Sequence, residues 1–262
     1  MITRGRLLRL IWLILAASAS CVAAPQQKPI TIYLAGDSTM ARKLPEKRPE
    51  TGWGEMLGEF FQDGKVIIDN RAQNGRSTRT FISEGHWQAI VDALRPGDYV
   101  FIQFGHNDES KEKVDRYTPP ADYRNNLIKF VSEVRARKAT PVLLTPVMRR
   151  RFDKEGNLQD THGEYPEIVR CVAGKYKVAL IDMQRSSAAV LAKYGAEESR
   201  KLFLQLKPNE KSNYPNGIED NTHFNPLGAE IMAGLAADGI HEQRLPIARF
   251  MTTRKTLQEI AR

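Results

Sequence analysis

Five short apolar segments alternate along the chain with longer amphipathic segments, and this alternation restricts the possible folds more than any other feature of the sequence. Each apolar segment is nearly continuous in character and is bounded by Gly, Pro or Asp, which is typical of strands covered on both faces. The five segments are residues 30–35, 66–68, 99–104, 141–145 and 178–181. The pattern predicts a parallel sheet of about five strands.

Two of the intervening segments have a clear helical pattern. Apolar side chains recur at helical spacing over residues 123–134, directly after a pair of prolines. Asn225 and Pro226 form a favourable cap and first turn for a second helix, which carries Leu227 and Leu235 on one side. The alternation of strands and helices predicts an α/β fold, a three-layer α/β/α sandwich with ligands bound at the carboxyl ends of the strands.

Residues 1–24 have the composition of a signal peptide. Three arginines precede an apolar run at residues 10–17, and small residues at 22–24 end the segment. Because the run is too short to span a bilayer comfortably, we expect export to the periplasm or the cell exterior, with no stable membrane span. Residues 25–262 then form a single domain. Lipidation at Cys21 is the alternative, although the branched apolar residue usual three positions earlier is absent.

The charge and cysteine content narrow the class of protein further. Removing the predicted signal peptide lowers the formal net charge from +8 to +5 and leaves Cys171 as the only cysteine, so no intramolecular disulfide can form. Basic residues are scattered among acidic ones and aromatic residues do not interleave with basic runs, which argues against nucleic-acid binding. No Cys/His cluster with ligand spacing indicates a metal site.

A serine follows the first predicted strand at the point where ligands bind in such folds. Residues 36–39 read Gly-Asp-Ser-Thr, so Ser38 lies at the carboxyl edge of the sheet. Its hydroxyl can be a nucleophile, but a helix cap or a phosphate ligand is an equal alternative for this tetrapeptide alone. The G-x-S-x-G elbow of ordinary α/β-hydrolases is absent, which excludes that family as the template.

A base and its carboxylate partner stand together near the other end of the chain. Asp220 precedes His223 by three residues, and we expect both to lie on one loop that includes the irregular polar stretch at residues 207–221. A carboxylate in this position can fix the tautomer of the imidazole and stabilise its protonated form. The N-terminus of the next helix would disfavour protonation of His223, and Asp220 would offset that effect.

Acyl transfer also needs hydrogen-bond donors directed at a developing oxyanion. Gly75 lies in a turn after the second predicted strand, where a backbone N–H can approach a ligand closely because no Cβ intervenes. Asn107 follows the third predicted strand and can donate its side-chain amide. Taken singly, each of these turns is equally well explained as ordinary loop chemistry.

Taken together, these residues resemble, in order and spacing, the motif blocks of the SGNH (GDSL-like) hydrolase superfamily. The blocks are residues 36–39, Gly75, residues 105–108, and Asp220 with His223. The resemblance implies a flavodoxin-like fold and Ser38 as nucleophile, supported by His223 and Asp220. It also implies an oxyanion hole made of the N–H groups of Ser38 and Gly75 and of Nδ2 of Asn107. No metal or organic cofactor is implied.

Within the superfamily, the sequence is most similar to the rhamnogalacturonan acetylesterases. The similarity rests on residues 33–39, 52–54, 74–77, 103–108 and 220–224. It implies a secreted carbohydrate esterase that removes acetyl groups from acetylated pectic polysaccharide through an acyl-enzyme. An acetylesterase acting on xylan or another glycan is the first alternative. A lipase or thioesterase should have an apolar channel near the motif loops, whereas these loops are polar. A non-catalytic glycan-binding module does not require Asp220 and His223 together with Asn107.

Four further residues are candidate substrate contacts. Arg76 and Arg149 can meet the carboxylates of galacturonate, although each can equally be solvated or paired with a nearby carboxylate. Trp53 can pack over the site or brace the helix after Ser38. His106 can face substrate or be structural, and His162, on the polar loop at residues 149–166, is a further possible substrate contact.

Overall fold

The computed structural model describes residues 28–252. Residues 1–24, with the predicted signal peptide and Cys21, lie outside the described residues. The central sheet consists of β1 (Ile30–Gly36), β2 (Val66–Asn70), β3 (Tyr99–Gln103), β4 (Thr140–Leu144) and β5 (Ala179–Ile181). All neighbouring pairs are parallel, in the order β2-β1-β3-β4-β5. The predicted five-stranded parallel sheet is confirmed, and its order is that of flavodoxin-like folds.

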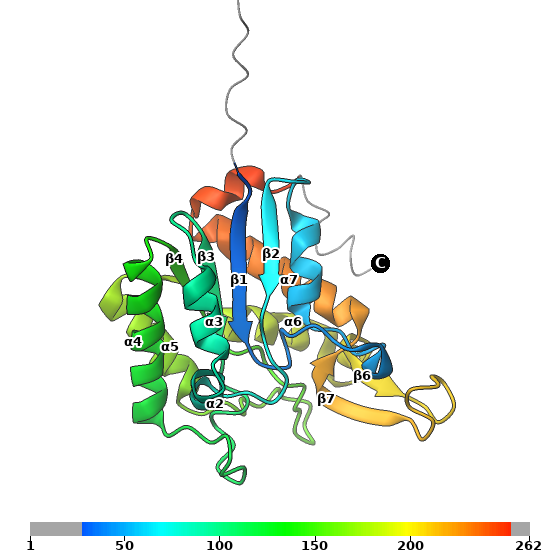
Figure 1. The fold of residues 1–262 in the computed structure, drawn as a ribbon. Helices are drawn as coiled ribbons and strands as arrows, with labels where there is room; N and C mark the ends of the chain where they lie inside the picture. The colour runs from blue at the N-terminus through cyan, green and yellow to red at the C-terminus, as the bar shows by residue number, and fades with distance from the viewer. Residues whose placement is uncertain (1–27, 253–262) are drawn as a thin grey trace, which may run out of the picture.

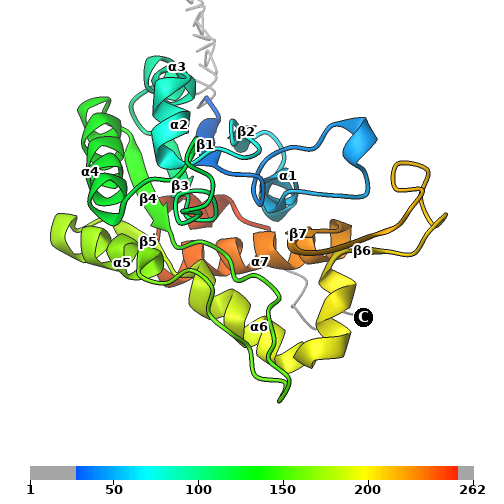
Figure 2. The ribbon, with the colours of Figure 1, turned by 90° about the horizontal axis from the view of Figure 1, so that it is seen from below.

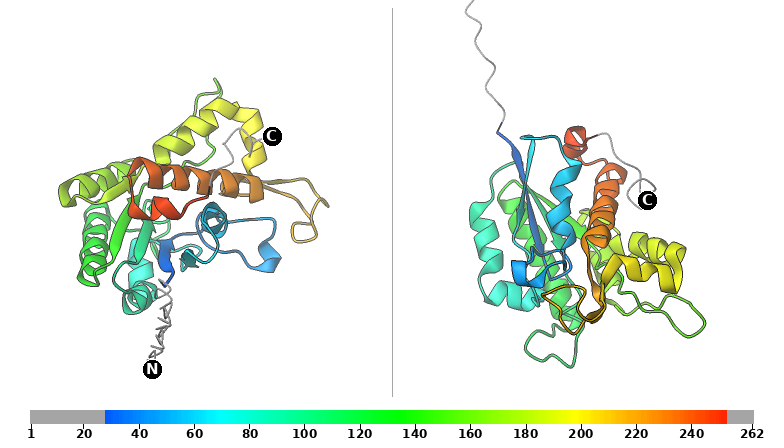
Figure 3. Two further views of the ribbon diagram at one scale, coloured as in Figure 1. Left: turned by 90° about the horizontal axis from the view of Figure 1, so that it is seen from above. Right: turned by 90° about the vertical axis from the view of Figure 1, so that its right-hand side faces the viewer.

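Helices cover both faces of this sheet (Figures 1 and 3). One face packs against α2 (Thr78–Ser83), α3 (His86–Ala93), α4 (Pro120–Ala136) and α5 (Tyr165–Tyr176). The other packs against α1 (Trp53–Met56), α6 (Met183–Glu198) and α7 (Pro226–Glu242). Along β1, Tyr33 and Ala35 belong to the first core, whereas Ile32 and Leu34 belong to the second. This alternation explains why the strand is apolar throughout.

The two helices with the clearest sequence patterns form as expected. In α4 the five apolar residues of the pattern are buried, and the helix begins at a proline, whose missing N–H has no helical partner at that position. In α7 the side chain of Asn225 accepts a hydrogen bond from the N–H of Gly228, and Pro226 occupies the first turn. Here Gly228 allows close packing, because a Cβ would lie 1.8 Å from the carbonyl oxygen of Leu202.

The remaining elements connect the layers. They are η1 (Pro45–Lys47), η2 (Leu57–Phe60), η3 (Ser199–Leu202), η4 (Pro246–Phe250), β6 (Phe203–Leu206) and β7 (Ile218–Phe224). β6 and β7 form an antiparallel pair that is separate from the central sheet. The expectation that Asp220 and His223 lie on a loop is therefore wrong, since both belong to β7. A strand of mostly polar residues lacks the apolar pattern on which the sequence prediction depended.

The β6–β7 hairpin is fastened to the segment that follows β1. The side-chain amide of Asn213 donates to the carbonyls of Pro45 and Arg48, both at 2.9 Å, and the hydroxyl of Tyr214 donates to the carbonyl of Lys47. At the other end of the hairpin, the N–H of Thr51 donates to the carbonyl of Phe224. These contacts bring β7 to the carboxyl edge of the central sheet, as the view from below shows (Figure 2).

Within residues 28–252, no helix is long and apolar enough to cross a membrane. The same residues contain no group of three or more His, Cys, Asp or Glu side chains placed to hold a metal ion.

Candidate active site

Ser38, His223 and Asp220 form a continuous line of hydrogen bonds at the carboxyl edge of the sheet. Oγ of Ser38 lies 2.8 Å from Nε2 of His223, although 185 residues separate the two in sequence. Nδ1 of His223 lies 2.7 Å from Oδ2 of Asp220. In this geometry the histidine can take a proton from the serine hydroxyl while the carboxylate holds the opposite side of the ring.

The carboxylate of Asp220 is held in its ionised form. Burial by itself raises the pKa of this carboxyl, but the hydrogen bond and charge of His223 and the backbone N–H groups of Thr222 and His223 outweigh it, so the pKa lies below its usual value. An ionised Asp220 accepts a hydrogen bond from Nδ1 of His223. Nε2 is then free to accept the hydrogen of Ser38.

A buried chain of hydrogen bonds supports the turn that carries Ser38. The indole N–H of Trp53 donates to Oε1 of Gln103, and Nε2 of Gln103 donates to Oγ1 of Thr39. Thr39 in turn donates to Oδ1 of Asp37, next to Ser38. Of the two alternatives for Trp53, packing over the substrate does not fit the structure, because its side chain is completely buried and its only polar group is used in this chain. It braces the turn instead.

A buried lysine ties the Ser38 turn to the neighbouring Gly75 turn. Nζ of Lys43 donates to the carbonyl of Ser38 at 2.5 Å and to Oδ1 of Asn74 at 2.8 Å. It also forms an ion pair with Glu50 at 2.7 Å, and only 1% of the lysine side chain is exposed. One ammonium group therefore fixes the position of Ser38 relative to the residue before Gly75.

The three N–H groups expected to bind an oxyanion have no competing use among the residues that the structure describes. Gly75 has a φ of 75°, a left-handed conformation that favours glycine. Among residues 28–252, neither the N–H of Ser38 nor that of Gly75 has a hydrogen-bond acceptor. Nδ2 of Asn107 donates to the carbonyl of Arg76 at 3.0 Å, which fixes the amide and leaves its second hydrogen unused. The site lies between the ends of β1 and β3, where the strand order of the sheet reverses.

The comparisons with known proteins agree with this geometry. The model of the GDSL-like lipase/acylhydrolase family matches residues 34–231, which include the Ser38 turn and β7. The chain belongs to the GDSL-like lipase/acylhydrolase family. As a member of this SGNH family it is a carboxylic ester hydrolase.

Curated relatives of this GDSL-like acylhydrolase include proteins of bacteria and fungi. The rhamnogalacturonan acetylesterase RhgT of Bacillus subtilis is 41% identical over 234 residues, which cover 89% of this chain and 99% of the relative. The probable rhamnogalacturonan acetylesterase YesY of the same organism is 38% identical, over 82% of this chain and 94% of the relative. The rhamnogalacturonan acetylesterase of Emericella nidulans is 29% identical, over 83% and 87%.

Solved structures share the fold of this acylhydrolase. The crystal structure of protein YxiM from Bacillus subtilis has a TM-score of 0.71 and 27% identity, and the match covers 83% of this chain and 58% of that chain. The acetylxylan esterase Axe2 from Geobacillus stearothermophilus has a TM-score of 0.58 and 16% identity, covering 87% of this chain and all of that chain. At this identity the likeness to Axe2 concerns the fold alone.

Three of the candidate substrate contacts lie close together around Glu109 and Asp37. His106 is 5% exposed, and its Nδ1 faces Oδ2 of Asp37 at 3.2 Å. Arg149 pairs with Glu109 and donates to the carbonyl of His106. His162 is 1% exposed and lies between Glu109 and the carbonyl of Val147. The structure does not fit the expectation of substrate contact for these residues, because the ring of His106 is buried and the polar groups of Arg149 and His162 are bound by nearby carboxylates and carbonyls.

Arg76 is only partly available. Its Nε pairs with Glu84 at 2.7 Å and its Nη1 donates to the carbonyl of Asn74, while 40% of the side chain is exposed. The backbone carbonyl of Arg76 holds the amide of Asn107, so the residue contributes to the site through its main chain. Its side chain pairs with a carboxylate of the same surface, the alternative that the sequence left open.

The Asp37 and His106 pair lies directly beneath Ser38. Burial lowers the pKa of His106 to about 4, against the opposing effect of Asp37, so the ring is neutral at neutral pH. Burial alone would raise the pKa of Asp37, but His106 and the hydrogen bonds of Thr39 outweigh it and lower the pKa to about 2. The carboxylate of Asp37 is therefore a buried negative charge next to Ser38.

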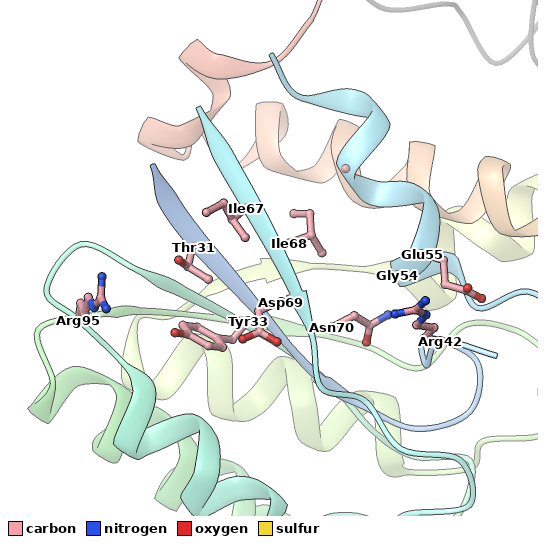
Figure 4. Close-up of a pocket in the computed structure, with 11 residues that line it drawn as sticks. Thr31, Tyr33, Arg42, Gly54, Glu55, Ile67, Ile68, Asp69, Asn70 and Arg95 are labelled. Carbon is pink, nitrogen blue, oxygen red and sulfur yellow. The ribbon is translucent and has the colours of Figure 1, made fainter. Parts of the chain in front are cut away.

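Two surface hollows flank β1 and β2. One follows the edge strand β2, where Tyr33, Asp69 and Glu55 line it, and it contains neither Ser38 nor His223 (Figure 4). The other adjoins the Gly75 turn. It is lined by residues 41–45, Arg48, Asn70 and residues 72–74. The lining of this second hollow is mixed, since three basic and three amide side chains stand beside alanine, leucine and proline.

Sequence reasoning missed Lys43 and Asp37. Lys43 belongs to a charged stretch, residues 42–50, in which nothing in the sequence separates a buried lysine from exposed ones. Asp37 adjoins Ser38 in the motif, but its partner His106 is 69 residues away. Only the pairing of β1 with β3 brings the two together.

Proposed function

We propose that this esterase is exported and removes acetyl groups from the rhamnogalacturonan backbone of pectin, with Ser38 as nucleophile, His223 as base and Asp220 as its partner. The observation that carries the proposal is the unbroken line of hydrogen bonds from Ser38 through His223 to Asp220, beside unused N–H groups at Ser38 and Gly75. The 41% identity to a rhamnogalacturonan acetylesterase supports the substrate, and residues 1–24 support export.

The proposed reaction proceeds in two halves. Oγ of Ser38 attacks the acetyl carbonyl carbon while His223 takes the serine proton, and the N–H groups of Ser38, Gly75 and Asn107 bind the oxyanion. Protonated His223 then gives its proton to the sugar oxygen as the ester bond breaks, which leaves an acetyl group on Ser38. In the second half, His223 takes a proton from water as the water oxygen attacks the acetyl group, and it then gives that proton to Oγ of Ser38 as acetate leaves.

The charged groups beside the site support a carbohydrate ester over a lipid ester. The hollow beside the Gly75 turn is lined by two arginines, a lysine, two asparagines and a glutamine, together with two alanines, a leucine and a proline. A lipase binds an acyl chain in an apolar channel, and burying such a chain against these charged groups would leave them without water or partners. An acetyl group needs no such channel.

Acetate release from defined substrates tests the proposal. We expect the purified protein to release acetate from acetylated rhamnogalacturonan faster than from acetylated xylan, and to hydrolyse a small aryl acetate. The Ser38→Ala variant should lose at least about 10⁴-fold in kcat, as in serine hydrolases whose nucleophile is removed. Ser132→Ala, an exposed serine on α4, is the matched control and should keep full activity.

The outcomes separate the parts of the proposal. No acetate from any of these substrates would refute the esterase mechanism. Release from xylan alone would refute the pectic substrate while leaving the mechanism intact. Normal turnover by Ser38→Ala would show that another group is the nucleophile.

A further inference from the structure

The guanidinium of Arg116 lies directly against Gly75. A Cβ built on Gly75 would be 3.1 Å from Nη1 of Arg116 and 3.9 Å from its Cζ. Any side chain at position 75 would therefore press on this guanidinium. Glycine here both adopts the left-handed conformation and leaves the space that Arg116 occupies, which places a positive charge beside the proposed oxyanion hole.

Arg116 has a hydrogen-bond donor to spare. Its Nε and Nη2 contact only Oδ2 of the adjacent residue Asp115, at 3.3 and 3.2 Å. Nη1, the nitrogen nearest Gly75, has no acceptor among the residues that the structure describes. Because 69% of the Asp115 side chain and 30% of the Arg116 side chain are exposed, the pair is weak and does not satisfy the guanidinium.

Three arginines of the neighbouring loops donate to acceptors within the protein. Arg76 pairs with Glu84, and Arg149 pairs with the largely buried Glu109. Arg150 donates to Oγ of Ser199 and to Oδ1 of Asn221. Arg116 thus differs from these three in having an unused N–H group that faces the Gly75 turn.

The loop that carries Arg116 is fixed at both ends to the site. Nη2 of Arg79 donates to the carbonyl of Val114 at 2.7 Å. On the other side, the N–H of Thr118 donates to the carbonyl of Asp108 at 2.9 Å, next to Asn107. These two contacts hold the main chain two residues before and two residues after Arg116, beside the Gly75 turn.

We infer that Arg116 binds the carboxylate of a uronic acid unit in the substrate and so selects acidic over neutral acetylated glycans. The inference rests on the proposed function and deepens it by naming a residue for the acidic sugar. A guanidinium with a free N–H offers a charge-assisted hydrogen bond to a carboxylate, which a neutral sugar cannot accept with equal strength. The charge lies against Gly75, a proposed oxyanion donor.

A matched pair of inhibitors tests the inference. The first is an unacetylated rhamnogalacturonan oligosaccharide, and the second is the same oligosaccharide after chemical reduction of its carboxyl groups to neutral alcohols. We measure Ki for each against hydrolysis of an aryl acetate by the wild-type protein and by Arg116→Gln, Arg116→Lys and Arg95→Gln. Arg95 is an exposed arginine that precedes β3, at the opposite edge of the sheet.

In Arg116→Gln we expect Ki for the acidic oligosaccharide to rise about tenfold, the effect of losing one charge-assisted hydrogen bond, with no change in Ki for the reduced one. For Arg116→Lys, which keeps the charge, Ki for the acidic oligosaccharide should lie between the values for the wild-type protein and for Arg116→Gln. Arg95→Gln should match the wild-type protein. Added salt should weaken binding of the acidic inhibitor to the wild-type protein and to Arg95→Gln more than to Arg116→Gln.

Three results would overturn the inference. They are equal Ki values for the acidic inhibitor in wild type and Arg116→Gln, an equal rise for both inhibitors, or no preference of the wild-type protein for the acidic one. Acetate release from acetylated rhamnogalacturonan is measured separately. If that activity is absent while Ki still depends on Arg116, the proposed substrate is wrong and the carboxylate site stands.

Discussion

Lys43 offers the sharpest test of how the site is held together. Replacing it with methionine keeps a stem of similar length and removes the ammonium group. Three acceptors then lose their donor: the carbonyl of Ser38, Oδ1 of Asn74 and the carboxylate of Glu50. The side chains of the Lys43–Glu50 pair are only 1% and 13% exposed, so water replaces the lost contacts poorly.

The expected loss follows from these contacts. Removing one partner of a buried ion pair costs about 3–5 kcal/mol, because the other charge remains buried without compensation. We expect Lys43→Met to lower the free energy of unfolding by about this amount. Since Lys43 also fixes Ser38 relative to Asn74, kcat for an aryl acetate should fall about 10-fold to 100-fold, the range for a displacement of reacting groups by about 1 Å.

Urea unfolding and aryl acetate kinetics measure the two effects separately. The double variant Lys43→Met with Glu50→Gln should regain part of the lost stability, because no uncompensated charge remains, but should not regain kcat. Lys201→Met is the matched control, since its pair with Glu198 is 64% and 62% exposed and its loss should cost less than about 1 kcal/mol. The reasoning is refuted if Lys43→Met is no less stable than Lys201→Met, or if it keeps wild-type kcat.

Two further variants test the Gly75 turn and the buried carboxyl group of Asp108. Gly75→Ala should lose about 1–2 kcal/mol of unfolding free energy, because alanine is strained in a left-handed backbone, and its kcat should fall because the new Cβ displaces Arg116. Gly156→Ala has a similar φ and nothing within 4 Å of the added Cβ, so it should lose stability alone. Equal kcat in the two variants would contradict this. Asp108→Asn tests a pH dependence, because burial raises the pKa of Asp108 from 3.8 to about 7, with a smaller contribution from Asp37. Between these values the folded protein binds a proton that the unfolded chain does not, so this carboxyl stabilises the fold at low pH and the effect is lost as pH rises through about 7. The unfolding free energy of wild type minus that of Asp108→Asn should therefore fall between about pH 4 and 8, and a difference that does not change with pH would be evidence against it.

The local sequence carried enough information to predict the sheet and the main helices. Strands buried on both faces must be apolar at almost every position, so β1, β3 and β4 could be recognised without any knowledge of their neighbours. The same reasoning failed for β7. Its residues are mostly polar and only partly buried, because the strand belongs to a small separate sheet with β6, and so no apolar pattern marks it.

The residues expected to contact substrate show the limit of sequence reasoning more clearly. An arginine or histidine in a polar loop has the same local sequence whether it faces solvent, a ligand or a buried carboxylate. Arg149 and His162 both turn toward Glu109, and His106 turns toward Asp37. Arg116, in contrast, had no distinguishing feature until the structure placed its guanidinium against Gly75.

The sequence alone determined the architecture and the chemical groups of the site, because strand burial and the short motifs around Ser38, Gly75, Asn107 and His223 are local properties of the chain. The tertiary structure decided which charged side chains remain available for a ligand. That choice depends on contacts between segments far apart in sequence, such as Lys43 with Asn74 and the hairpin tip with residues 45–48. A charge is used or left free according to which partners folding brings within a few ångströms of it.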